Sequence, residues 1–368
     1  MKAISIFIFL MFPFVSVYPQ SKAELNTQLF NAVRSRDMEG VKKSLLAGAD
    51  INARNKMGGV NKETSLMYAA ASGNLPMIKL LLSKGADLYL MGDLGKTALS
   101  ATAEYEMDDA PEVVSFLISQ YKNPSHLKRD IADLILESAR HLNKTILKYL
   151  ISQKYSVNVT FGDVKDSFSD KGTTPICVAI SDRRNAAEII QLLIDAGAEM
   201  NPASKSYPPL NCFMFHATSF HLTPSEIAER SPAYQKILQI LLEAKANPNI
   251  PEGSETPLMH AVKYGDIKFA EILLTYGADI NAKGLYGKSV LMYAFPDKNY
   301  NRTPSKECPP EEDAMRLELL KFLVSRGARM NDRDDHGNTV IYYANKGAYG
   351  SSVKYLKKIG LKLPEADR

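Results

Sequence analysis

Apolar residues recur along the chain with the spacing of amphipathic helices, and several of these helical patterns end in the same way. Each closes with a pair of branched apolar residues, and Gly-Ala begins three residues after the pair. The pairs are Leu81-Leu82, Leu193-Ile194, Leu273-Leu274 and Leu323-Val324. The segment from Gly48 to Ala53 returns unchanged from Gly277 to Ala282. A pattern that recurs in one sequence context is a repeat, so we expect a repeat architecture.

A second motif opens the helix that comes next. It consists of Thr or Ser, often followed by Pro or a small residue, and then Leu or Ile. It stands at 64–66, 97–99, 174–176 and 256–258, with looser copies at 223–224, 289–291 and 339–341. Thr can accept hydrogen bonds from the first N–H groups of a helix, and Pro at the first helical position removes no needed donor. Each repeat therefore predicts two helices, the second ended by a Gly in the left-handed conformation.

These motifs resemble the ankyrin repeat, with its Thr-Pro-Leu-His-x-Ala, mid-repeat Gly, Leu-Leu and Gly-Ala-Asp. Aligning on the Gly of Gly-Ala-Asp gives the equivalent positions Gly48, Gly85, Tyr121, Lys154, Gly197, Lys245, Gly277, Gly327 and Gly360. The family's period is ~33 residues. The resemblance covers residues 24–368 and implies an all-α fold, an ankyrin-repeat solenoid of about nine stacked helix-turn-helix units with short hairpin loops.

Some units depart from this pattern. The third has Gln120-Tyr121 where Gly-Ala belongs. The fourth, around 131–156, lacks both motifs but keeps apolar residues at helical spacing, so we interpret it as a degenerate repeat. The long spacings predict insertions near 157–171, 201–222 and 297–312, which in such arrays form loops on one face.

The first residues have the pattern of a leader. Met1-Lys2 precedes an apolar run from Ala3 to Val17, shorter than the ~20 residues that a membrane span needs. We interpret residues 1–23 as a signal peptide, with cleavage after Ala23 or, as an equal alternative, nearer Gln20, and expect an exported protein, periplasmic or secreted. The alternative is a retained N-terminal membrane anchor. No later segment is apolar enough for stable membrane insertion of the mature chain.

The composition narrows the function. The net charge is +4, and basic residues are interspersed with acidic ones, so we expect no nucleic-acid partner. There is no Gly-rich phosphate loop, nucleophile elbow or His-Glu-x-x-His motif. We therefore predict a monomeric, non-catalytic protein without a cofactor, whose partner is another protein. The fold itself does not identify that partner.

Three cysteines are an odd number for an exported chain. Cys177 falls on a predicted buried helix face, which favours a core thiol. Cys212 and Cys308 fall in predicted insertions; a disulfide between them is one alternative, and two separate thiols are favoured over it. Cys212, His216 and His221 are zinc-type ligands. The alternative function is therefore a metal-binding or enzymatic protein with its site around Cys212–His221 and Asn301–Cys308, although the ligand spacing matches no known finger.

Ankyrin arrays bind proteins through a concave face built from hairpin tips and the ends of the first helices. Carried onto this chain, that resemblance implies a partner-binding set at the tips and helix ends, in which the aromatic and aliphatic members suit hot spots. The set is Val60, Asn61, Asp93, Leu94, Tyr105, Lys263, Tyr264, Leu285, Tyr286, Asp335 and His336.

Overall fold

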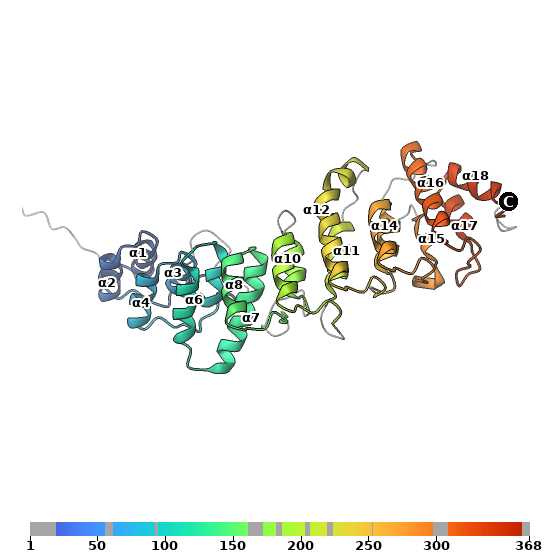
Figure 1. The fold of residues 1–368 in the computed structure, drawn as a ribbon. Helices are drawn as coiled ribbons and strands as arrows, with labels where there is room; N and C mark the ends of the chain where they lie inside the picture. Colours follow the sequence, from blue (N-terminus) through green and yellow to red (C-terminus); the bar gives the residue numbers. More distant parts are fainter. Residues whose placement is uncertain are drawn as a thin grey trace, which may run out of the picture.

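The fold is a curved stack of helix pairs, seen here in a computed structural model (Figure 1). The structure describes residues 20–55, 62–92, 95–160, 172–181, 186–202, 207–218, 224–251, 253–296 and 308–362. In these ranges all regular structure is helical, and β pairing is confined to isolated bridge residues, among them the pairs Arg54–Thr64 and Lys283–Ser289. The predicted all-α solenoid is confirmed. None of the described helices combines the length and apolar character that crossing a bilayer requires.

The first helices of successive units stack into an inner row. They are α1 (Lys22–Arg34), α3 (Ser65–Ala71), α5 (Ala98–Ala101) continued by η2 (Thr102–Glu104), α7 (Pro124–Arg140), α9 (Pro175–Ser181), α11 (Pro209–Thr218), α13 (Pro257–Tyr264), α15 (Val290–Tyr293) and α17 (Val340–Lys346). Helix α1 begins at Lys22, so two residues that we assigned to the leader belong to the first helix.

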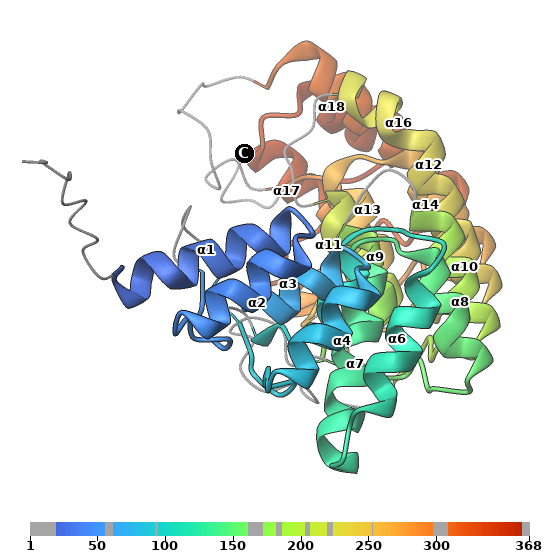
Figure 2. The same ribbon diagram turned by 90° about the vertical axis from the view of Figure 1, so that its left-hand side faces the viewer.

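The second helices form an outer row, which lies on the rim of the curve in Figure 2. They are α2 (Met38–Leu46), α4 (Leu75–Ser83), α6 (Ala110–Ser119), α8 (Lys144–Ser152), α10 (Ala186–Asp195), α12 (Pro224–Glu243), α14 (Ile267–Thr275), α16 (Pro310–Ser325) and α18 (Gly350–Lys358). Within the described ranges, pairing each inner helix with the outer helix that follows it gives nine units, numbered 1 to 9 below.

Side chains that we predicted as caps accept hydrogen bonds from N–H groups at the starts of several helices. The hydroxyls of Thr64, Thr97 and Thr256 accept the backbone N–H three residues on, at 3.2–3.4 Å. The outer helices begin with side chains that do the same, those of Asp37, Asn74, Asn143 and Asp266. These contacts satisfy N–H groups that the helices cannot bond internally.

The aligned glycine position ends the outer helices in the left-handed conformation. Six of the aligned residues are Gly with positive φ, and Lys154 and Lys245 adopt it too, with φ of 63° and 65°. Side chains other than Gly rarely occupy this region, so the two lysines show that the turn is imposed by the repeat. Tyr121 does not share it, because α6 passes into α7 over residues 120–123 without a hairpin.

The sixth unit differs from the prediction. We expected Thr223-Pro224 to open an inner helix and 201–222 to be an insertion. Instead Pro224 begins the outer helix α12, and the inner helix α11 lies inside the predicted insertion. Leu210 and Phe213 of α11 are fully buried between the neighbouring units. The helix was missed because Pro208 replaces the Thr that marks the other inner helices.

The inner helices of most units carry a small buried residue at one common position. Five residues after the Thr or Ser of the opening motif, or after its equivalents Asp133 and Pro208, the side chain is fully buried in units 2 to 9. It is Ala69, Thr102, Ser138, Ala179, Ala261, Ala294 or Ala344, and in unit 6 it is Phe213. A small side chain lets backbones pack closely, which is the role that we predicted for Ala.

Asparagine side chains link each unit to the next along the turns. The Asn four residues after the left-handed position accepts a backbone N–H from the equivalent turn of the following unit at 2.8–2.9 Å. The pairs are Asn52–Asp87, Asn158–Glu199, Asn201–Asn247, Asn249–Asp279 and Asn281–Arg329. Three of these amides also donate to a carbonyl of the next unit. We call this set the Asn ladder.

Replacing one member of the Asn ladder should loosen one junction between units. Asn249 accepts from the Asp279 N–H and donates to the Gly277 carbonyl. We expect Asn249→Ala to lower the free energy of unfolding by about 1 kcal/mol, the net value of a typical hydrogen bond. Asn249→Asp keeps the acceptor and should lose less. Urea denaturation of both variants measures this, and equal losses would contradict the role of the acceptor.

Candidate interaction surface

The inner row and the turns before it line the hollow of the curve (Figure 2). Two positions meet there in units 3 and 7: the residue just before the capping residue, and the residue seven after the capping residue. In unit 3 these are Lys96 and Glu104, and in unit 7 they are Glu255 and Lys263. Both are ion pairs, with the basic residue before the cap in unit 3 and the acidic residue before the cap in unit 7. The charges at these two points of the face are therefore paired within the protein.

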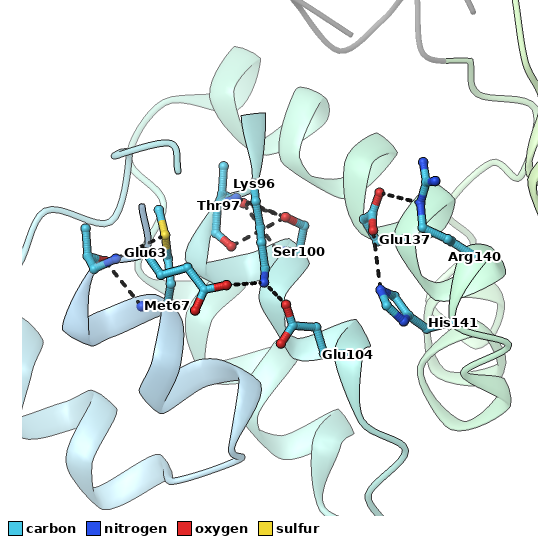
Figure 3. A network of polar contacts seen from close by, with 10 residues as sticks. Glu63, Met67, Lys96, Thr97, Ser100, Glu104, Glu137, Arg140 and His141 are labelled. Carbon is cyan, nitrogen blue, oxygen red and sulfur yellow. Dashed lines mark hydrogen bonds and ion pairs between the residues drawn. The ribbon is translucent and has the colours of Figure 1, made fainter. Parts of the chain in front are cut away.

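Two separate groups of polar contacts lie in units 2 to 4 (Figure 3). Lys96 lies between Glu63 of the preceding turn, at 2.7 Å, and Glu104 at the end of η2. In the next unit Glu137 contacts Arg140 at 3.1 Å and His141 at 3.6 Å. Burial opposes ionisation of Glu137, but the hydrogen bonds from His141 and Arg140 prevail and lower its pKa.

In unit 7, two residues that we predicted to contact a partner, Lys263 and Tyr264, make contacts inside the protein or are partly buried. Lys263 pairs with Glu255 at 3.1 Å, and His260 lies 3.6 Å from the same carboxylate. Burial lowers the pKa of His260. The positive charge of Lys263 lowers this pKa further, and the negative charge of Glu255 opposes the shift. Tyr264 is half-buried at the end of α13. A partner at this point would compete with contacts inside the protein.

The turns before units 8 and 9 present a different surface. Leu285 and Tyr286 are 47% and 57% exposed, on the short η4 (Leu285–Gly287). The ring of Tyr286 packs edge-on against His336 of the next turn, with centroids 6.1 Å apart. The Asp335 N–H donates to the Tyr286 carbonyl at 3.0 Å. We call Leu285, Tyr286, Asp335 and His336 the tip cluster; the structure brings these four predicted residues together.

The tip cluster rests on a fixed support. The Leu285 N–H donates to the Tyr293 hydroxyl at 3.1 Å. The Tyr343 hydroxyl donates to Asp334 at 2.5 Å, and Asp334 in turn accepts the His336 N–H at 2.9 Å. Burial and the bond to Asp334 raise the pKa of Tyr343 well above its ordinary range, so it remains a donor.

The remaining predicted residues are scattered. Tyr105 is 61% exposed after η2, and its carbonyl accepts from Asn143. Val60, Asn61, Asp93 and Leu94 lie outside the described residues. Three exposed aromatic residues were not predicted: Tyr207 and Phe215, because we did not recognise α11, and Tyr276 at the end of α14. The run Pro208-Pro209-Leu210 was the signal that could have revealed α11.

The cysteines pair differently from either alternative. Cys212 forms a disulfide with Cys177, not with Cys308, so Cys177 is no core thiol. The two residues lie on the stacked helices α9 and α11, with Cα atoms 5.4 Å apart, a distance that suits the bond. Cys308 is not in a disulfide. The disulfide removes Cys212 as a thiolate ligand, His221 lies outside the described residues, and no potential metal-binding group of three occurs among those described.

Unit 4 buries a carboxylate where its neighbours carry a capping threonine. In unit 2, the inner-helix cap Thr64 lies ten residues before Asn74, the cap of the outer helix α4. In unit 4, the residue ten positions before Asn143, the cap of the outer helix α8, is Asp133. Because α7 already begins at Pro124, Asp133 lies inside the helix and has no N–H group to cap. Burial raises the pKa of Asp133 to about 7, against a lowering hydrogen bond from Ser100.

Comparisons with known proteins agree with this geometry. Family models of ankyrin repeats match residues 29–130, as three copies, and 241–294, as many copies. Human transient receptor potential cation channel subfamily A member 1 is 23% identical over 332 residues, 88% of this chain and 26% of that protein. Ankyrin repeat and KH domain-containing protein mask-1 of Caenorhabditis elegans is 24% identical over 309 residues, which are 78% of this chain and 11% of that protein.

Human mitochondrial disaggregase is 33% identical over 87 residues, which are 24% of this chain and 12% of that protein. The chain spans about a quarter or less of the length of these curated relatives. The likeness therefore concerns the repeats and not the other parts of these proteins.

Removing the charge of Asp133 should change how stability depends on pH. Because its pKa is raised from 3.8 to about 7, the folded state binds this proton more tightly than the unfolded state. The contribution to stability is complete below pH 4 and is lost as the pH rises to 7. We expect Asp133→Asn to be more stable than the parent at pH 8, on the order of a few kcal/mol, and nearly equal at pH 4.

Thermal melts across this pH range measure the difference between the two proteins. Asp108→Asn, which changes an exposed carboxylate, is the control and should follow the parent profile. If the stability of Asp133→Asn depended on pH in the same way as that of the parent, the raised pKa assigned to Asp133 would be wrong.

Proposed function

We propose that this chain, which is an ankyrin repeat protein, is an exported, non-catalytic scaffold that binds a partner protein on its concave side, with the tip cluster as anchor. Ankyrin repeats indicate a protein–protein interaction scaffold, and the array described above is built from them. The tip cluster adds a location, because its Leu285 and Tyr286 side chains are exposed, whereas Lys96 and Lys263 elsewhere on the concave face are held in ion pairs.

The conformation of Tyr286 carries the proposal. It has φ 56° and ψ 33°, a left-handed conformation that is costly for a bulky residue, and its ring is more than half exposed. Neither the strain nor the exposure stabilises the fold, and such strain gathers at binding sites. An exposed Tyr held in one position loses little freedom on binding, which is why Tyr is frequent among hot spots.

Export is supported by two independent features. The charged start and short apolar run have the pattern of a secretory leader. The disulfide between Cys177 and Cys212 fits an oxidising compartment, because thiols in the cytosol are kept reduced.

Fractionation of the producing cells and N-terminal sequencing test the export. We expect the protein outside the cytoplasm, with its N-terminus beyond the apolar run. A cytoplasmic protein that begins at Met1 would rule out export and leave the scaffold proposal standing.

Removing the Tyr286 ring should weaken binding without weakening the fold. The partner is first captured from the native compartment and purified. We then expect Tyr286→Gly to raise the Kd of the complex at least tenfold. A hot spot contributes about 2 kcal/mol or more to the binding free energy, and ~1.4 kcal/mol corresponds to a tenfold change in Kd. Gly adopts a positive φ without strain, so the melting temperature should be unchanged or higher.

Tyr276→Ala is the matched control, an exposed Tyr at the end of the outer helix α14 and outside the predicted partner-binding set. It should leave the Kd within about twofold. Unchanged affinity in folded Tyr286→Gly would remove the tip cluster from the binding site.

A further inference from the structure

Unit 6 combines four local departures from the regular units. Pro208 stands at the start of α11 where Thr caps the regular inner helices. Phe213 occupies a fully buried position that is small in units 2 to 5 and 7 to 9, and Lys245 takes the left-handed position with φ 65°, as Lys154 does in unit 4. The outer helix α12 contains Pro232 in its interior, where the missing N–H interrupts the helical hydrogen bonds.

A weak unit has consequences for the whole array. In a solenoid each unit contacts only its neighbours, so stability is the sum of unit terms and interface terms. The unit with the poorest local terms is therefore the point at which the array divides most easily. By this reasoning unit 6 would separate units 1–5 from units 7–9.

The disulfide lies at this point. Cys177 is on α9 of unit 5 and Cys212 is on α11 of unit 6, so the bond joins the inner helices on the two sides of the junction. The Asn ladder adds one further link there, from Asn201 to the turn at Asn247. The position that lacks the repeat's own caps is thus the position with a covalent bond between helices.

We propose that the Cys177–Cys212 disulfide is a redox-sensitive clamp that keeps unit 6 folded, and that its reduction opens unit 6 and divides the array. The inference is independent of the partner-binding proposal. A dithiol reductant supplies the two electrons and two protons, and is itself oxidised to a disulfide. Its thiolate attacks the Sγ of Cys212, because Cys212 is a half-buried residue whereas Cys177 is only 3% exposed. Cys177 leaves as the first thiolate, and the second thiol of the reductant releases Cys212.

Hydrogen exchange followed by mass spectrometry tests the clamp in the processed full-length protein. We expect dithiothreitol to speed amide exchange at least tenfold in peptides from 209–218 and 232–243. Peptides from α3 and α4, and from α16, should change less than twofold. A uniform change along the chain, or no change in unit 6, would overturn the proposal.

Variants remove the dependence on added reductant. Cys177→Ser with Cys212→Ser should show the rapid exchange of unit 6 without dithiothreitol, with circular dichroism confirming that most helix remains. Cys308→Ser is the control and should respond to dithiothreitol as the parent does. Titration of the denatured oxidised protein should find one thiol; three thiols in protein from an oxidising compartment would refute the bond itself.

Discussion

A hydrogen bond from one turn to the next fixes the register of the whole array. Each Asn of the ladder sits at the same place in its turn and accepts an N–H from the same place in the following turn. Its contribution as a single contact is small, but it repeats at most of the junctions. Because a solenoid has no long-range contacts to correct a misplaced unit, a directional bond at these five junctions determines how one unit sits on the next there.

The sequence predicted the fold where each residue acts within its own turn. Thr64 and Thr256 cap helices, and Gly48 and Gly277 end them, and these roles depend on local backbone geometry alone. The Asn ladder was not predicted, since its bonds join positions about one repeat apart. Tyr286 and His336 were predicted separately as tip residues, but their contact depends on the relative placement of two turns.

Two errors had a common origin. Pro208 hid the start of α11, and without that helix Cys212 was assigned to a loop. A cysteine in a loop can meet another loop, whereas a cysteine on α11 meets the helix stacked against it, which carries Cys177. The disulfide could therefore be identified only after the helices of unit 6 had been placed, which required their packing and not their sequence motif.

The disulfide also sets how far the chain can be stretched. Cys177 and Cys212 are 35 residues apart in sequence, and their Cα atoms lie 5.4 Å apart. At ~3.3–3.6 Å per extended residue, the enclosed segment has a contour length of about 120 Å. When the two ends of the array are pulled apart, the oxidised protein retains that length as a closed loop. The reduced protein can release it, so the thiol chemistry of one junction determines the mechanical reach of the molecule.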